Sequence, residues 1–144
     1  MFDQIISPIS PQIERFEQRL DQTLTSDVEL VQTMSDHLME TRGKRFRPAL
    51  SLLTAQAIGD CSDDVIDASV GIELIHWATL IHDDVIDLAE TRRGAEVINF
   101  RWGDHAAVLM GDLLLARALE VLVGLNSMAV MEAATRATRR MIEG

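Results

Sequence analysis

The sequence predicts an all-α protein with a single helical domain over residues 1–144. Two patterns lead to this prediction. Apolar residues recur every three or four positions along most of the chain, which is typical of the buried face of a helix. No segment shows sustained alternation of apolar and polar residues, so we expect no sheet. With 144 residues, 47% of them hydrophobic, the chain can build one core but is short for two.

Capping and breaking residues divide this pattern into six helices. Ser10 and Pro11 are typical of a helix N-terminus. Asp27 can cap a second helix, and Gly43 and Gly59 are residues that end helices. The predicted helices cover residues 10–24, 27–43, 48–58, 63–88, 104–123 and 127–143. The fourth is the longest, and at roughly 1.5 Å per residue it can form the wall of a deep cavity.

The composition excludes several classes of protein. The most apolar stretch, residues 106–125, is interrupted by charged residues, so we expect no membrane span. The N-terminus lacks the basic start and long apolar run of a signal peptide. Cys61 is the only cysteine and cannot form an internal disulfide. We therefore expect a cytoplasmic protein.

The pentapeptide Asp-Asp-Val-Ile-Asp occurs twice, at residues 63–67 and 83–87. The first copy begins a predicted helix, where the acids complement the helix dipole, and no arginines follow it. We interpret Asp63 and Asp64 as structural. The second copy ends the same helix, where acids oppose the dipole and need another explanation. Metal binding provides that explanation.

The second copy has the geometry of a magnesium site. Asp83 and Asp87 are four residues apart, so their carboxylates share one helix face, roughly 5–6 Å apart at Cβ. This spacing suits Mg²⁺ that bridges to a phosphate. Arg92 and Arg93 follow shortly after, and guanidinium groups complement phosphate oxygens. Together these residues predict a diphosphate substrate.

A second cationic cluster supports this prediction. Four positive charges occur in residues 42–47, here named the basic segment, of a chain whose formal net charge is −10. Nucleic acid would need an extended basic face rather than one compact cluster, so we expect no nucleic-acid partner. A compact cluster suits a small, multiply charged anion. The four cations are Arg42, Lys44, Arg45 and Arg47.

These motifs together resemble a known family. The sequence Gly-Lys-Arg-Phe-Arg-Pro at 43–48, then Glu-Leu-Ile-His at 73–76, then the second aspartate motif with Arg-Arg-Gly at 92–94, and Gly-Asp at 111–112 follow one another in order. In this order they are similar to the N-terminal half of trans-type polyprenyl diphosphate synthases, in particular long-chain, octaprenyl-like members. The resemblance implies part of an isoprenoid synthase fold, a helical bundle around a central cavity.

The resemblance also implies the reaction and its residues. The family condenses isopentenyl diphosphate head to tail with an allylic diphosphate, using Mg²⁺. The implied metal ligands are Asp83 and Asp87, supported by Asp84, and Arg92 would contact the allylic diphosphate. These four residues are the implied catalytic set. The residues implied to hold isopentenyl diphosphate are Lys44, Arg47, His76 and Arg93.

Two small residues just before the metal motif predict the product. Thr79 and Ala78 precede Asp83 by four and five positions, one helical turn deeper in the cavity. In similar synthases bulky aromatics at these positions block the hydrocarbon chain, whereas small side chains leave the tunnel open. We therefore expect a long product. Substituting Phe at Ala78 should shorten it.

Several alternatives remain open at this stage. The chain ends before the second aspartate-rich motif of the family, so we expect a truncated chain that is inactive alone and self-associates into a homo-oligomer. The alternative is a non-catalytic or complementing subunit of a two-component prenyl synthase. His76 could instead be a buried core histidine. Arg45 is expected to pair with surface acids, and Asp112 to be a paired buried carboxylate or a cavity residue.

Overall fold

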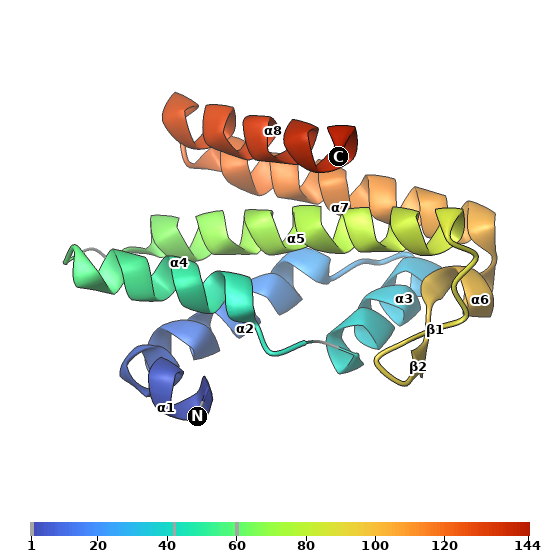
Figure 1. The fold of residues 1–144 in the computed structure, drawn as a ribbon, viewed down its shortest axis with the longest axis horizontal. Coiled ribbons are helices and arrows are strands. Elements are labelled where there is room, and N and C mark those ends of the chain that lie inside the picture. Colours follow the sequence, from blue (N-terminus) through green and yellow to red (C-terminus); the bar gives the residue numbers. More distant parts are fainter. Residues whose placement is uncertain (1, 42, 60) are drawn as a thin grey trace.

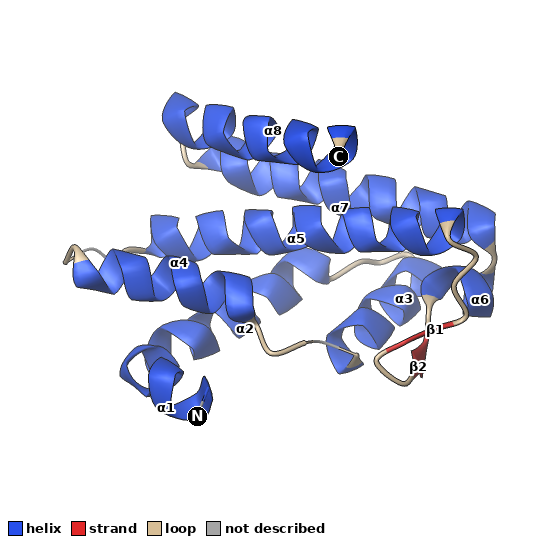
Figure 2. Ribbon diagram, viewed as in Figure 1, coloured by secondary structure: helices blue, strands red, loops and turns tan. Residues whose placement is uncertain are grey.

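A computed structural model describes residues 2–41, 43–59 and 61–144, and most of these residues are helical (Figure 1, Figure 2). The helices are α1 (Phe2–Ile6), the 3-10 helix η1 (Ser7–Ile9), α2 (Ser10–Leu24), α3 (Glu29–Glu40), α4 (Phe46–Ala57), α5 (Asp63–Ile86), α6 (Ile98–Trp102), α7 (Asp104–Gly124) and α8 (Met128–Glu143). Two short strands, β1 (Thr91–Arg92) and β2 (Ala95–Glu96), lie between α5 and α6.

The long helix α5 is the central element of the fold. It runs through the middle of the molecule, with α7 and α8 on one side and α2, α3 and α4 on the other (Figure 1). Its buried residues are distributed around the helix, as expected for a helix covered on several sides. Helices α5 and α7 approach closely at two glycines. A Cβ atom on Gly71 of α5 would overlap the side chain of Leu122, and one on Gly111 of α7 would overlap the ring of His82. The α5–α7 pair therefore forms a close-packed support for the residues at the end of α5.

The six predicted helices are confirmed, with differences of up to three residues at their starts and ends. Ser10 is itself helical, and its hydroxyl donates to the Ser7 carbonyl instead of capping. The prediction that Asp27 caps the second helix is wrong, because Val28 precedes α3 and its N–H donates to the Ser26 hydroxyl. Helix α4 begins two residues before Pro48, which is tolerated because N–H groups in a first helical turn have no intrahelical partner.

The prediction of no sheet is wrong for residues 91–96, here named the arginine hairpin. Thr91 pairs with Glu96 and Arg92 with Ala95 in an antiparallel ladder. The two turn residues, Arg93 and Gly94, have φ values of 54° and 83°. Positive φ at both central residues is the signature of a type I′ turn, which matches the twist of a two-residue hairpin. Strands of two residues are too short to show the alternation on which the prediction rested.

Short helices were also absent from the prediction. Neither α1 nor α6 exceeds five residues, so neither has room for a repeating apolar pattern. Across the described part of the chain, every helix is too short or too polar to cross a membrane.

Candidate active site

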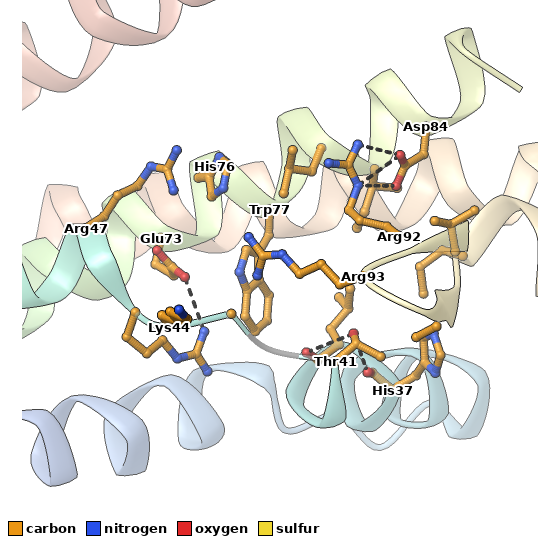
Figure 3. Close-up of a pocket in the computed structure, with 18 of the residues that line it drawn as sticks. His37, Thr41, Lys44, Arg47, Glu73, His76, Trp77, Asp84, Arg92 and Arg93 are labelled. Atoms are coloured by element: carbon orange, nitrogen blue, oxygen red, sulfur yellow. Dashed lines mark hydrogen bonds and ion pairs between the residues drawn. The ribbon is translucent and has the colours of Figure 1, made fainter. Parts of the chain in front are cut away.

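A cavity of about 600 Å³ lies beside α5, between the basic segment and the arginine hairpin (Figure 3). Its walls come from residues 37–41 and 43–47, from one face of α5, and from residues 92–98. Cations outnumber acids on these walls, although the whole chain is acidic. The charged and imidazole side chains that line the cavity are His37, Lys44, Arg45, Arg47, Glu73, His76, Asp84, Arg92, Arg93 and Glu96.

The basic segment supplies one wall of the cavity. Lys44 and Arg47 are exposed, and neither forms an ion pair with another described residue. Arg42, the first cation of the segment, lies outside the described residues. Cations without acidic partners are available to a bound anion, so Lys44 and Arg47 fit the predicted role of phosphate contacts.

Arg45 behaves differently from its neighbours, and its predicted pairing with surface acids is wrong. Its side chain is only 7% exposed and points into the protein. It donates to both carboxylate oxygens of Glu17, at 2.7 and 3.0 Å, and to Glu73 Oε1 at 3.2 Å. Its guanidinium also lies over the rings of Phe16 and Trp77. Arg45 is therefore part of the core between α2, α4 and α5.

His76 lies on the α5 wall of the cavity, between Arg47 on one side and Arg92 and Arg93 on the other (Figure 3). Burial, and to a smaller extent the positive charges of Arg47, Arg93 and Arg92, lower the pKa of its imidazole to about 4. The ring is therefore neutral at pH 7. Its position on the cavity wall favours the ligand role over that of a core histidine, the two alternatives left open by the sequence.

Asp84 is buried and bound to Arg92, whereas the sequence suggested that it supports a metal. Arg92 Nη2 donates to Asp84 Oδ1 at 2.7 Å, and Nε donates to both oxygens at 3.1 and 3.3 Å. The hydrogen bond to Asp84 raises the pKa of Arg92, and the charges of Asp83 and Asp87 act in the same direction. Among the described residues, Arg92 Nη1 makes no hydrogen bond, so it can still donate to a ligand.

Asp83 and Asp87 are exposed at the end of α5 and do not line the cavity. Within the described ranges, their carboxylates form no hydrogen bond or ion pair. The described residues also contain no group of three or more His, Cys, Asp or Glu side chains that could hold a metal. Two carboxylates nevertheless fit Mg²⁺, which is commonly held by one or two carboxylates together with substrate phosphates.

The arginine hairpin is held in place by residues that the sequence did not indicate. His37 Nε2 donates to the Glu96 carbonyl at 2.7 Å, and His37 Nδ1 lies 3.4 Å from Arg101 Nη1. The Asn99 amide donates to the carbonyls of Asp84 and Ala89, which joins the end of α5 to the hairpin. No motif marks His37 or Asn99, because the groups that they bond in the hairpin and at the end of α5 are backbone carbonyls.

Arg93 reaches from the hairpin back to the basic segment (Figure 3). A Cβ atom at Gly43 would overlap the Arg93 guanidinium. Glycine at position 43 therefore permits the close approach of the two cationic stretches, which places Arg93 near the basic segment.

Three other predicted residues lie away from the cavity lining. Ala78 is buried in the core at 2% exposure. Thr79 is half-buried and donates to the His76 carbonyl. Asp112 is exposed, so the prediction of a buried carboxylate is wrong, although its carboxylate does lie 3.3 Å from His82 Nε2. The side-chain volumes at Ala78 and Thr79 remain a prediction about product length.

The first aspartate motif lies at the opposite end of α5. Asp63 forms an ion pair with Arg15, and Asp67 one with Arg19 at 2.6 Å, both from α2. Asp63 and Asp64 occupy the first turn of the helix, as predicted. The observed ion pairs agree with the structural interpretation of this copy.

The sequence matches the model of the polyprenyl synthetase family over residues 28–144. The chain belongs to this family. It is 37% identical to the all-trans-nonaprenyl-diphosphate synthase (geranyl-diphosphate specific) of Rhodobacter capsulatus, over 97% of this chain and 43% of that protein. It is also 37% identical to the octaprenyl diphosphate synthase of Escherichia coli strain K12, over 84% of this chain and 38% of that protein.

Solved structures of polyprenyl synthases have the same fold. The polyprenyl synthase from Caulobacter crescentus CB15, crystallised with calcium and isoprenyl diphosphate, matches with a TM-score of 0.94 and 34% identity. The match covers 99% of this chain and 44% of that one. The expected partial isoprenoid synthase fold is therefore confirmed, and the chain spans less than half the length of these relatives.

Proposed function

We propose that this chain forms the diphosphate-binding half of a prenyltransferase that condenses isopentenyl diphosphate with an allylic diphosphate. One observation supports this most strongly: cations from the basic segment and from the arginine hairpin converge on a single cavity, whose α5 wall carries the neutral imidazole of His76. The substrates of such a reaction carry two separate diphosphates. The paired arginines and the basic segment supply donors for both.

The described residues suggest a division of labour at the two diphosphates. Lys44, Arg47, His76 and Arg93 would hold isopentenyl diphosphate, with neutral His76 as a hydrogen-bond donor. Arg92 would hold the allylic diphosphate through Nη1, while Asp84 fixes the orientation of its guanidinium. In the reaction the allylic C–O bond breaks, the isopentenyl double bond attacks the allylic cation, and a proton is lost. Oriented cations stabilise the charge that develops on the leaving diphosphate.

The proposed metal ligands are Asp83 and Asp87. Helix geometry places His76, Asp83 and Asp87 on one face of α5, because they are seven and four residues apart. Bound Mg²⁺ would neutralise charge on the departing diphosphate. The two carboxylates would hold it there, and Arg92 would share the same leaving group.

We further propose a long polyprenyl product. The support is the small size of Thr79 and Ala78, which lie about one helical turn before the metal motif. Thr79 is three residues from His76 and four from Asp83, so it shares their face of α5. Ala78 is in the core, where a larger side chain must displace neighbours.

A chimera can test the activity. In it, this chain replaces the aligned segment of the octaprenyl diphosphate synthase of E. coli, and condensation of labelled isopentenyl diphosphate with an allylic primer is measured. We expect activity, a raised KM for isopentenyl diphosphate with Lys44→Ala or Arg47→Ala, and little change with Arg15→Ala. An active chimera that tolerates Lys44→Ala, Arg47→Ala and Arg92→Ala without loss would contradict the proposal.

The isolated 144-residue chain tests the alternative of a complementing subunit. Its exposed apolar side chains on α7 and α8 include Leu109, Val123 and Ile142. We expect this chain to self-associate and to be inactive alone, because contiguous apolar surface drives association. Light scattering and the condensation assay check both points. Activity that appears only on mixing with a second natural subunit would favour the two-component alternative.

A further inference from the structure

Arg45 is the one cation of the described basic segment whose side chain is buried. Lys44 before it and Arg47 after it are exposed at the cavity. Arg45 instead enters the core, where it contacts two carboxylates and lies 5.1 Å from the centre of the Trp77 ring and 5.7 Å from that of Phe16. Burying a charge is unfavourable unless its hydrogen bonds are satisfied. Here the carboxylates of Glu17 and Glu73 satisfy them.

The backbone of Arg45 is also unusual. Its φ and ψ values are 55° and 39°, in the left-handed region, immediately before the first residue of α4. Residues other than glycine adopt this conformation only when their surroundings enforce it. At this turn the Arg45 side chain is buried against Glu17 and Glu73, while the side chains of Lys44 and Arg47 are exposed at the cavity. The bonds of the Arg45 guanidinium to Glu17 and Glu73 connect this turn to α2 and α5.

Two of the residues that Arg45 contacts, Glu73 and Trp77, belong to the cavity wall itself. Glu73 and Trp77 are one helical turn apart on α5 and flank His76 in sequence, and all three line the cavity (Figure 3). Glu17 comes from α2, outside the cavity lining. Arg45 thus links the basic segment to the same stretch of α5 that carries His76. A shift of Arg45 would change the distance between the basic segment and His76.

We propose that Arg45 is a positioning residue, whose buried guanidinium fixes Lys44 and Arg47 opposite His76 and so sets the affinity of the cavity for a diphosphate group. This proposal rests on the proposed function, in which Lys44, Arg47 and His76 bind a diphosphate group. Lysine cannot replace Arg45, because an ammonium group lacks the planar fork that bonds Glu17 twice and Glu73 at the same time.

The test uses the purified 144-residue chain and inorganic pyrophosphate, with and without Mg²⁺, in isothermal titration calorimetry. Arg45→Lys should weaken pyrophosphate binding by about tenfold. Glu17→Gln should weaken it by about threefold, because Glu17 lies outside the cavity and this substitution removes only part of the support of Arg45. The matched control is Arg19→Lys, which alters another arginine–carboxylate pair of α2, distant from the cavity. The control should bind pyrophosphate like the unmodified chain.

A second readout separates positioning from stability. The charge of Arg47 lowers the pKa of His76, so displacement of the basic segment should raise that pKa in the ligand-free protein. NMR titration of the His76 ring should show this rise in Arg45→Lys and Glu17→Gln, with circular dichroism confirming that each variant is folded. No rise should occur in Arg19→Lys.

The outcomes distinguish this proposal from the proposed function. Folded Arg45→Lys or Glu17→Gln with unchanged pyrophosphate affinity and unchanged His76 pKa would overturn the positioning role. If Arg45→Lys does not fold, Glu17→Gln alone decides between the two results. An unmodified chain that does not bind pyrophosphate would contradict the proposed function, and the His76 pKa would still test the positioning of the basic segment.

Discussion

The two copies of Asp-Asp-Val-Ile-Asp occupy opposite ends of α5 and have opposite surroundings. At the N-terminal end, Arg15 pairs with Asp63, and Arg19 pairs with Asp67. The helix dipole also favours acids in a first turn. This copy therefore joins α5 to α2, and the charges of Asp63 and Asp67 are compensated within the protein.

The C-terminal copy is divided between two environments. Asp84 is buried and satisfied by Arg92, whereas Asp83 and Asp87 are exposed and, among the described residues, have no partner in a hydrogen bond or ion pair. Acids in a last turn oppose the helix dipole. The same pentapeptide therefore differs in its ion pairs at the two ends of α5, because the fold places different arginines beside each copy. The contrast leads to five predictions, given from the largest expected effect to the smallest.

Exchanging carboxylates for amides at each end should give the largest difference. In the chimera, Asp83→Asn with Asp87→Asn should lower kcat at least about 100-fold, the scale of losing stabilisation of developing charge. The matched pair Asp63→Asn with Asp67→Asn should change kcat less than about threefold, because those side chains lie outside the cavity. Steady-state kinetics with labelled isopentenyl diphosphate measure both.

The same contrast predicts where ligands are seen in crystals. Crystals soaked with Mg²⁺ and a bisphosphonate should show density at Asp83 and Asp87. Density at Asp63 or Asp67 would show that the two copies are not distinguished as described.

Between the two ends, the side chain at Thr79 should control product length. Thr79→Phe places a ring on the face shared with His76 and should shift the chimera to shorter products. Ala78→Phe should also shorten the product, but with a lower Tm, because Ala78 is fully packed. Chromatography of dephosphorylated products checks the first effect and thermal melting the second. Farnesol as the main product of the unmodified chimera would contradict the assignment of a long product.

The two arginine–aspartate pairs should contribute unequally to stability. Arg92→Ala leaves Asp84 buried without its partner, which should lower the free energy of unfolding by about 2 kcal/mol. Arg19→Ala removes a pair in which the arginine is 46% exposed, and should cost less than about 1 kcal/mol. Urea denaturation of both variants compares them. Equal losses would mean that the ends of α5 are energetically alike.

The arginines near the C-terminal half of α5 should be detectable through the pKa of His76. Its pKa of about 4 in the folded chain lies below the ordinary value of 6.5. Between these values the unfolded chain binds a proton that the folded chain does not, so this group makes the folded state less stable as pH falls from 6.5 towards 4. NMR should give the low pKa, and Arg47→Gln should raise it. A bound pyrophosphate anion should also raise it.

Residues with a local signal were predicted well from the sequence. The long helix α5 could be assigned, and Lys44 and Arg47 could be placed together, because periodicity and motif order are local properties of the chain. Their role in diphosphate binding stays a prediction. Burial of Arg45 could not be predicted, since its acidic partners are each 28 residues away, one in either direction. A charged residue in a basic cluster is ordinarily solvated, and only the tertiary fold reverses that expectation.

The arginine hairpin could not be predicted from the sequence either. Its strands contain two residues each, and its turn has Arg93 before Gly94 rather than the common Asn-Gly pair. The anchors of the hairpin are likewise hidden, because His37 bonds to the carbonyl of Glu96, which any residue would offer.

The left-handed turn at Arg93 has a consequence for protein engineering. With a φ of 54°, arginine is less favourable there than glycine, by about 1 kcal/mol. A mutant library selected for heat resistance should therefore enrich glycine at position 93, although glycine would remove a cation from the cavity wall. Selection for thermostability and selection for ligand affinity would drive this position in opposite directions.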